Sequence, residues 1–252
     1  FHAIESDFHT SIPSCLGTMN RLTVVDLEYN RLTGSLPNSL GSLDKLSYFS
    51  VGYCNFMSGP IPSTLCDALQ LATFGIEANQ FTGTIPTCVN KLTNMNTLTL
   101  SSNQLSGSFP SALCDMIWMS SFNIGGNMFD GTIPTCINQW THIYTMDIYY
   151  NKFSGTLPLS LTQIPLQNIY FNFNYLSGTI PSEIMKLTIL KTLGLDNNLF
   201  TGSIPVMPIG TDLKNIWLQS NQLTGSIPTG LFNSIDAAVI YIADNMLTGT
   251  IP

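Results

Sequence analysis

Residues 221–228 read NQLTGSIP and residues 79–86 read NQFTGTIP, so nearly the same eight residues occur twice in a chain of 252 residues. The closing proline of this motif occurs eleven times, and seven of the ten intervals between neighbouring prolines are 24 residues long. These prolines are Pro13, Pro37, Pro62, Pro86, Pro110, Pro134, Pro158, Pro181, Pro205, Pro228 and Pro252. Except at the first, a glycine lies three residues before each proline and an asparagine seven before it. So regular a period predicts a stack of similar coils.

The apolar residues ahead of each asparagine have the spacing of a short strand. In LTVVDLEYN (residues 22–30), Val25 and Leu27 lie two apart before Asn30, and other periods repeat this spacing. Residues two apart face the same side of a strand, so each such pair is predicted to be buried. A further apolar residue two places after the asparagine, such as Leu32, returns to the core. Each period is therefore predicted to form a strand, a turn, an extended TGxIP segment and a short helical return.

The repeated asparagine, glycine and proline each have a mechanical role in such a coil. Asparagine carries donors and an acceptor, so stacked copies can form a ladder that satisfies backbone groups where strand pairing stops. Glycine permits backbone torsions that a Cβ forbids, and proline sets φ at the start of the helical turn. One period cannot bury its apolar residues alone, but stacked periods share a continuous core.

The full pattern, LxxLxLxxNxLTGxIPxxL, resembles the plant-specific class of leucine-rich repeat, which occurs in receptor-kinase ectodomains and in polygalacturonase-inhibiting proteins. The resemblance covers essentially the whole chain. It implies an α/β fold, a right-handed solenoid with a parallel β-sheet on its concave face and short 3-10 or irregular helices on its convex face. We expect residues 1–252 to form a single array of about ten repeats of 23–25 residues, uncapped at both ends. Such an array is either a piece of a longer chain, which we favour, or has its ends covered by other copies.

The composition limits the classes of partner. Eight Lys and Arg against fifteen Asp and Glu give a net charge of −7, which disfavours nucleic acid and anionic membrane surfaces. No stretch of 18 or more apolar residues occurs, so no membrane span is expected in this chain.

No catalytic constellation is apparent in the sequence. The histidines His2, His9 and His142 do not have metal-ligand spacing, and no GxSxG or phosphate-binding motif occurs. Asp147 and Asp196 could form a glycosidase-like carboxylate pair, but a solvated face is the better interpretation. The sequence therefore predicts a protein that is not an enzyme and that needs no cofactor or metal.

Alternate residues of each predicted strand point to the concave face, where a ligand would bind. In the C-terminal half they form three columns, defined by their distance from the repeated asparagine. Four residues before it lie Asp147, Tyr170, Gly194, Trp217 and Tyr241. Two residues before it lie Tyr149, Asn172, Asp196, Gln219 and Ala243. Directly before it, in a rim column, lie Tyr150, Phe173, Asn197, Ser220 and Asp244.

These columns carry aromatic rings beside carboxylates and amides, which suits binding of a sugar chain or an extended peptide. The predicted ligand-binding residues are Asp147, Tyr149, Tyr150, Tyr170, Phe173, Asp196, Trp217 and Tyr241. Receptors of the resembled class that bind a peptide's free carboxylate use arginines on this face, and here no Lys or Arg falls on the columns. A carbohydrate, or a basic or neutral protein, is therefore favoured. The alternative interpretation is that the aromatic side chains only stiffen the strands. If they bind a ligand instead, we expect Trp217→Ala and Tyr170→Ala to leave stability nearly unchanged.

The sequence thus predicts a non-catalytic extracellular module, secreted or at the cell surface, that binds a carbohydrate or protein ligand or serves in assembly. Two alternatives remain open: a structural protein that polymerises head-to-tail through its open ends into a filament or cell-wall assembly, and a glycosidase inhibitor. Threonines beside the motif glycine, such as Thr82 and Thr84, form a regular row that could bind ice, but they belong to the consensus of the repeat.

Four of the six cysteines are predicted to form disulfides. Cys66 and Cys114 lie four residues after their motif prolines, whereas Cys88 and Cys136 lie two residues after the prolines of the following periods. Residues two apart on a helical turn differ by about 200°, so one can face the next coil and the other the previous coil. We expect Cys66–Cys88 and Cys114–Cys136 bonds and hence an oxidising compartment. Six free thiols in a cytosolic protein are the competing interpretation.

The two remaining cysteines have different expected roles. Cys15 also lies two residues after its proline, so its partner would belong to a coil before Phe1. Counting from the strand puts Cys54 in the asparagine position of its period, whereas counting from Pro62 puts Asn55 there. We interpret Cys54 as a small, buried, reduced side chain in that position.

Overall fold

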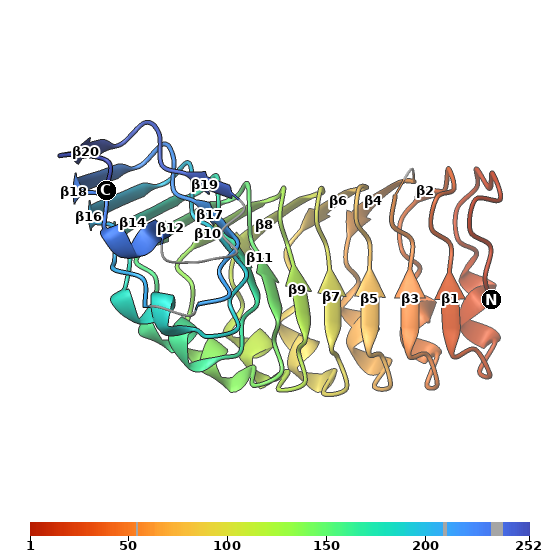
Figure 1. Cartoon of the computed structure of the whole chain (residues 1–252). Coiled ribbons are helices and arrows are strands. Elements are labelled where there is room, and N and C mark those ends of the chain that lie inside the picture. The colour runs from red at the N-terminus through yellow and green to blue at the C-terminus, as the bar shows by residue number, and fades with distance from the viewer. Residues whose placement is uncertain (54, 209–210, 233–238) are drawn as a thin grey trace. The chain divides into compact units, whose positions relative to one another are not determined.

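The computed structural model describes residues 1–53, 55–208, 211–232 and 239–252. It divides into two compact units, Phe1–Phe129 and Asp130–Pro252, which are described separately. Each unit repeats the predicted order of strand, extended segment and 3-10 helix, which Figure 1 shows along the chain. The coils are those of a solenoid, as the repeat predicts.

The residues ahead of each asparagine form the strands of a parallel sheet, here called the first sheet. In the first unit it contains β1 (Val24–Asp26), β3 (Tyr48–Ser50), β5 (Thr73–Gly75), β7 (Thr97–Thr99) and β9 (Ser121–Asn123). In the second unit it contains β11 (Thr145–Asp147), β13 (Asn168–Tyr170), β15 (Thr192–Gly194), β17 (Asn215–Trp217) and β19 (Val239–Tyr241). Every strand has three residues, because the chain turns away at the asparagine. The predicted parallel sheet is confirmed.

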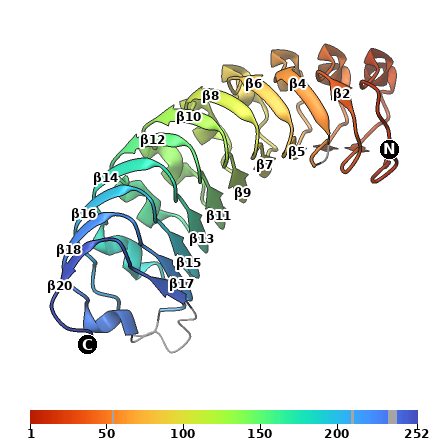
Figure 2. The same cartoon turned by 90° about the horizontal axis from the view of Figure 1, so that it is seen from above.

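A second parallel sheet, which the sequence did not predict, is built from the extended TG segments. In the first unit it contains β2 (Thr33–Gly34), β4 (Phe56–Pro60), β6 (Gln80–Gly83) and β8 (Gln104–Ser108), and β10 (Met128–Gly131) lies at the boundary of the units. In the second unit it contains β12 (Lys152–Gly155), β14 (Tyr175–Thr179), β16 (Leu199–Ser203), β18 (Gln222–Ser226) and β20 (Met246–Thr248), which Figure 2 shows side by side. Stacking brings equivalent extended segments together, so their backbones pair.

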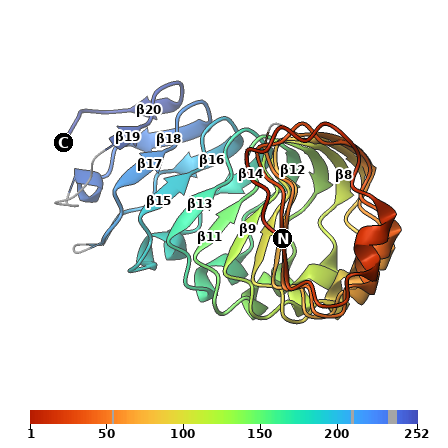
Figure 3. The ribbon, with the colours of Figure 1, turned by 90° about the vertical axis from the view of Figure 1, so that its right-hand side faces the viewer.

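Short 3-10 helices follow the motif prolines. They are η1 (Ser14–Thr18), η2 (Asn38–Ser42), η3 (Ser63–Asp67), η4 (Thr87–Lys91) and η5 (Ser111–Asp115) in the first unit, and η6 (Thr135–Gln139), η7 (Leu159–Gln163), η8 (Ser182–Lys186) and η9 (Thr229–Phe232) in the second. The proline at the start of η2, Pro37, has φ −71°, the value that its ring imposes. Seen end-on in Figure 3, the red helices of the first coils lie across from the N-terminal segment, which pairs with β1. The predicted helical returns are confirmed.

The predicted asparagine ladder is present in both units. Asn127 Oδ1 accepts a hydrogen bond from the Leu105 N–H at 2.9 Å. Its Nδ2 donates to the carbonyl oxygens of Leu100 (3.0 Å) and Ile124 (3.1 Å). Equivalent bonds are made by Asn30, Asn55, Asn79, Asn103, Asn174, Asn198, Asn221 and Asn245. Each asparagine thus joins its own turn to that of the preceding coil.

Asn55, and not the cysteine before it, occupies the ladder position of its period. Its Oδ1 accepts from the Leu32 N–H at 2.8 Å, and its Nδ2 donates to the Val51 carbonyl at 2.8 Å. The assignment of Cys54 to the ladder is therefore wrong, because only the amide of asparagine can accept one bond while donating others. Cys54 itself lies outside the described residues.

The apolar positions fill the interior of each unit. The residue two places after the asparagine is fully or almost fully buried throughout both units except in the last coil, as at Leu32, Phe81, Phe129, Phe153 and Phe200. Phe49 of β3 stacks on Phe74 of β5, with ring centroids 5.8 Å apart. Such repeated contacts between neighbouring coils provide the shared core that the period predicts.

The cysteine pairs lie between the helical returns. Cys66 on η3 and Cys88 on η4 form a disulfide with Cα atoms 5.9 Å apart, which is the predicted pairing. Cys114 and Cys136 are each disulfide-bonded as well, and their mutual pairing stays a prediction. Cys15 is a free, exposed thiol.

Removing one ladder amide should destabilise the second unit strongly. In Asn174→Ala the buried Phe153 N–H loses its acceptor, and the Ile148 carbonyl, which also accepts from Asn151 Nδ2, loses the shorter of its two side-chain hydrogen bonds. Unsatisfied buried groups cost about 1–3 kcal/mol each, so we expect the free energy of unfolding in urea to fall by about 3 kcal/mol. Asn138→Ala is the control, because that exposed amide bonds to the exposed Gln163 side chain and should change stability by less than about 0.5 kcal/mol. Equal effects of the two variants would contradict the ladder's role.

The disulfide between Cys66 and Cys88 should stabilise the first unit. It closes a loop with a sequence separation of 22 residues, which corresponds to about 3 kcal/mol in the chain-entropy estimate. We expect Cys66→Ala/Cys88→Ala to lower the urea midpoint accordingly. Peptide mapping without reduction should recover the two cysteines on one cross-linked peptide and Cys15 on an alkylated one. Recovery of Cys66 and Cys88 as separate alkylated peptides would contradict the pairing in solution.

Candidate ligand-binding face

The face of the first sheet that points away from the core, here called the open face, carries the predicted columns. In the second unit the strand register places Asp147 beside Tyr170, Tyr170 beside Gly194, Gly194 beside Trp217, and Trp217 beside Tyr241. The residues four places before the asparagine therefore form one row across five strands. This is the arrangement that the repeat spacing predicts.

Gly194 leaves a gap in this row, and two aromatic rings lean over it. An ideal Cβ on Gly194 would lie 3.2 Å from Trp217 Cε3. The ring centroids of Tyr170 and Trp217 are 6.1 Å apart with a 39° tilt, although the two residues belong to strands on either side of β15. Both side chains are half-buried. The rings therefore contribute to packing as well, and Trp217→Ala should lower stability more than the sequence alone suggests.

Three buried polar atoms on this face have no hydrogen-bond partner among the described residues. They are the Trp217 Nε1–H donor and the side-chain carbonyl oxygens of Asn172 and Gln219. Asn172 Oδ1 would lie 3.4 Å from a Cβ on Gly194, so it borders the same gap. One donor and two acceptors without partners complement the donors and acceptor of a ligand amide. Hydrogen bonds from a ligand to these atoms would make the free energy of binding more favourable.

The two carboxylates of the predicted site differ in their environment. Asp147 is half-buried beside Tyr170, and its Oδ1 accepts the Tyr149 N–H at 3.0 Å. Burial raises the pKa of Asp147 to about 6. Asp196 was expected on the surface but is only 3% exposed, and it accepts a hydrogen bond from Asn197 Nδ2 at 2.8 Å. Burial also raises the pKa of Asp196. By exposed surface, Asp147 is the more accessible carboxyl of this pair.

Among the described residues, those directly before the ladder asparagines all adopt the left-handed backbone conformation. Their φ values lie between 49° at Tyr150 and 64° at Gly126, because the chain bends there from the strand into the asparagine turn. Tyr150 and Phe173 are 63% and 45% exposed, and their ring centroids are 5.9 Å apart. Tyr149 is half-buried and Tyr241 is 55% exposed. Residue type does not predict this conformation, since tyrosine and phenylalanine seldom adopt it. Only the position directly before the repeated asparagine indicates it.

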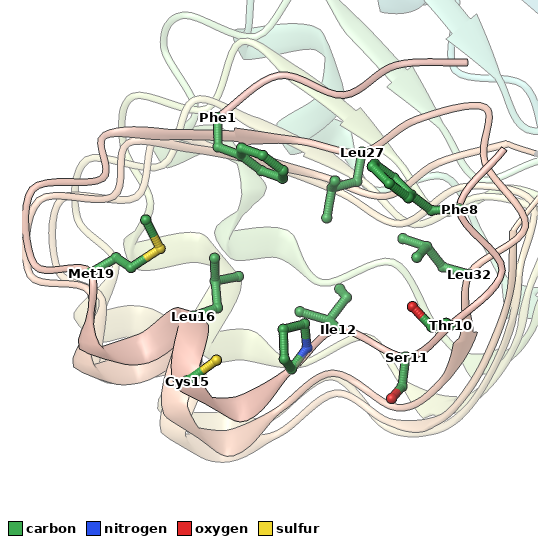
Figure 4. A pocket seen from close by; sticks show the side chains of 11 residues that line it. Phe1, Phe8, Thr10, Ser11, Ile12, Cys15, Leu16, Met19, Leu27 and Leu32 are labelled. Carbon is green, nitrogen blue, oxygen red and sulfur yellow. The ribbon is translucent and has the colours of Figure 1, made fainter. Parts of the chain in front are cut away.

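A separate apolar hollow lies at the first coil of the first unit. It has a volume of about 330 Å³ and is lined by side chains that include Phe1, Phe8, Leu16 and Met19. Figure 4 shows these side chains around the hollow, with Cys15 on η1 beside it. Phe1 and Phe8 are 53% and 43% exposed. An exposed apolar surface of this kind fits the alternative function of a structural protein that polymerises head-to-tail.

Groups of metal-binding side chains and membrane-spanning helices are both missing among the described residues. Among them, no three or more His, Cys, Asp and Glu side chains are grouped so that they could hold a metal ion. In the same part of the chain, no helix is long and apolar enough to cross a membrane.

The coil architecture and the sequence both match known proteins. The sequence profile of the Leucine Rich Repeat family matches residues 21–43, 94–116, 165–187 and 212–234. Receptor-like protein 49 of Arabidopsis thaliana is 51% identical over 47 residues, which are 19% of this chain and 6% of that protein. The chain therefore contains leucine-rich repeats at these four places and resembles plant proteins that are built from them.

Solved structures of plant receptors share this fold. The peptide hormone receptor RGFR1, in complex with RGF2, matches 96% of the chain at 28% identity with a TM-score of 0.92. The ectodomain of the Arabidopsis thaliana receptor kinase GASSHO1/SCHENGEN3, in complex with Casparian strip integrity factor 2, matches 97% at 31% identity with a TM-score of 0.93. The leucine-rich-repeat chain described here covers 39% and 30% of those two chains, and thus less than half of either.

The raised pKa of Asp147 predicts a pH-dependent stability. The folded state binds a proton more tightly than the unfolded state, so stability falls as pH rises from about 4 to about 6 and stays lower above that range. Asp147→Asn keeps the acceptor for Tyr149 and should raise the free energy of unfolding at pH 7 by about 1–2 kcal/mol, with little effect near pH 3. Urea titrations at both pH values measure this. The exposed Asp130→Asn is the control, and an equal gain there would contradict the assignment.

Proposed function

We propose that this chain is the ligand-binding part of an extracellular plant-type receptor or receptor-like protein. The open face of its second unit then binds an extended peptide segment. One observation carries the proposal: the tilted pair of Tyr170 and Trp217 lies over Gly194, on a face with three buried polar atoms that lack partners among the described residues. The proposed role requires no catalysis.

We favour an extended peptide over a sugar chain, because the similar receptor RGFR1 is a peptide hormone receptor and the groups on this face can bond to a peptide backbone. A peptide offers both N–H donors and C=O acceptors along its length, and the face has two unpaired carbonyl oxygens and one unpaired N–H within its described residues. Exposed aromatic rings at Tyr150 and Phe173 extend the surface toward the rim, where an apolar ligand side chain can pack. The similar peptide hormone receptor RGFR1 was solved with RGF2, and the similar GASSHO1/SCHENGEN3 ectodomain with Casparian strip integrity factor 2, which supports a ligand of that kind here.

An extracellular or cell-surface location supports this role. The disulfide between Cys66 and Cys88, together with the disulfide bonding of Cys114 and Cys136, fits an oxidising compartment. The relative Receptor-like protein 49 is named as a receptor-like protein, and the chain is similar to part of it. A carbohydrate, which the aromatic side chains of the face also suit, is the alternative ligand class that the binding test distinguishes from a peptide.

The binding test compares peptides with glycans on the same protein. A phage-displayed peptide library and a glycan array are screened, and the best hit of each is measured by isothermal titration calorimetry. We expect a peptide hit whose affinity falls at least tenfold in Trp217→Ala and in Tyr170→Ala, because central aromatic anchors contribute about 2 kcal/mol or more.

The control removes an exposed ring from a different sheet. Tyr175 begins β14 of the second sheet and is 57% exposed, so Tyr175→Ala should leave peptide binding unchanged. A glycan hit lost in the two open-face variants would replace the peptide by a carbohydrate. A peptide hit insensitive to both variants would place the binding site elsewhere and overturn the proposal.

Self-association is a second candidate function, because the apolar hollow at the first coil offers a surface for it. Its lining is almost wholly apolar, with Phe1, Phe8 and Met19 all substantially exposed. Analytical ultracentrifugation distinguishes this role from ligand binding. A concentration-dependent dimer abolished by Phe8→Ser supports it, and a monomer at all concentrations excludes it.

A further inference from the structure

The open face of the first unit carries carboxyl groups that no lysine or arginine of the described residues neutralises. Asp26 ends β1, Glu28 follows it by two residues, and Glu77 lies two residues after the end of β5. Among the described residues, the one ion pair of this cluster joins Asp26 to His2, with 3.5 Å between Oδ2 and Nδ1. The charge of −7 on the whole chain adds to this local excess of negative charge.

The carboxylate of Glu77 lies over a floor made by two glycines. An ideal Cβ on Gly75 would lie 2.9 Å from Glu77 Oε2 and 2.8 Å from Ser50 Oγ. A Cβ on Gly52 would lie 3.0 Å from the same Glu77 oxygen. The missing side chains at Gly52 and Gly75 therefore leave the space that the Glu77 carboxylate occupies.

Glu77 is a buried acid with an unsatisfied oxygen. The residue is 9% exposed, and its Oε2 has no hydrogen-bond partner in the described part of the chain. Burial, and in smaller part the charge of Glu28, raises the pKa of Glu77, while a hydrogen bond with the Thr99 side chain lowers it. Burying an unpaired carboxylate is energetically costly. A cation that approaches Glu77 would therefore stabilise its ionised form.

Glu28 and Ser50 connect Glu77 to the accessible surface. Ser50 Oγ donates a hydrogen bond to Glu28 Oε1 at 2.6 Å, and Glu28 is half-buried. Tyr48 lies in the same field, since burial and then the charges of Asp26, Glu28 and Glu77 raise its pKa. The carboxyl groups therefore act on one region of the face and leave it strongly negative.

A pair of aromatic rings borders this region at the rim. Tyr29 follows Glu28 and Tyr53 follows Gly52, and their rings stack with centroids 5.1 Å apart and an angle of 10° between their planes. The two rings are 43% and 40% exposed, so the part of the stacked pair that faces solvent can contact a ligand. Tyrosine rings beside carboxylates attract organic cations, because the ring faces carry negative charge.

The chemistry of the cluster favours an organic cation over a metal ion. Within the described residues, no group of three or more His, Cys, Asp and Glu side chains is placed to hold a metal ion. A guanidinium or ammonium group on a long side chain needs only one or two carboxylates and can also pack against tyrosine.

We propose that Glu28 and Glu77 bind the arginine or lysine side chain of an extended protein segment, with Ser50 positioning Glu28 and with Tyr29 and Tyr53 packing along the aliphatic part of that side chain. This site lies wholly in the first unit and shares no residue with the peptide-binding face proposed for the second. Failure of either proposal therefore leaves the other standing.

The test uses small probes that differ only in charge. N-acetyl-arginine amide, N-acetyl-lysine amide and the uncharged analogue N-acetyl-citrulline amide are titrated into ¹⁵N-labelled protein of the full chain, and amide shifts are followed by NMR. We expect the two cations to shift the Gly52 and Gly75 resonances and to bind at least tenfold more tightly than the citrulline probe. A carbon-detected titration should also show the pKa of Glu77 falling when the arginine probe is present.

Matched variants locate the site. Glu77→Gln and Glu28→Gln keep side-chain length and should each weaken binding of the arginine probe at least fivefold. Asp44→Asn removes one exposed charge between η2 and β3 and should leave binding unchanged. Gly75→Ala is a second kind of variant, because it keeps both carboxylates but places a methyl group in the space of the Glu77 oxygen, and it should also weaken binding.

Three results would overturn the proposal. Equal binding of the citrulline probe would show that charge is not recognised. Unchanged binding in both Glu28→Gln and Glu77→Gln would place the cation elsewhere. Calcium chloride that produces the same shifts and displaces the arginine probe would make the cluster a metal site.

Discussion

The side-chain amide of the ladder asparagine is the interaction on which the rest of the structure depends. Each three-residue strand ends abruptly, and the backbone groups of the following turn would otherwise be buried without partners. At Asn127 one amide accepts the Leu105 N–H of the preceding coil and donates to carbonyls of both coils. Because the same bonds recur in coil after coil, neighbouring turns are held in register. The strands can then stay short and parallel, and the apolar residues of successive coils meet in one core.

The ladder also fixes what the open face can display. Since the chain turns at each asparagine, the residue before it has a positive φ throughout the described part of the chain, even where it is tyrosine or phenylalanine. Side chains at equivalent positions are thereby repeated at the spacing of adjacent strands, about 4.8 Å. A glycine in such a row opens a space that neighbours fill. At Gly194 the neighbours are the rings of Tyr170 and Trp217, and at Gly75 the neighbour is the Glu77 carboxylate. The two faces thus use one structural device with different chemistry.

The candidate sites were accessible to sequence reasoning only in part. Counting four residues back from each repeated asparagine correctly placed Asp147, Tyr170 and Trp217 in one row. The count succeeds because alternate residues of a strand are buried and the residues between them point to the open face. It failed for Asp196, which is on the correct face but is covered and bonded to Asn197. It also passed over Glu77, whose significance lies in its position over glycines, one of them in another coil. The exposure of a side chain depends on residues about 23 to 25 positions away, which the local pattern does not contain.

The sequence by itself determined the repeat, the strand positions, the helical returns after proline and the pairing of Cys66 with Cys88, because each follows from spacing within one or two periods. Only the tertiary structure decided that the TG segments pair into a second sheet and that Asn55 fills the ladder position. It also decided which polar atoms are buried without partners among the described residues. The physical reason is that backbone pairing and burial are settled when coils stack. At that stage residues a full period apart come into contact, and packing and hydrogen bonding between them select one arrangement among those that the local spacing permits.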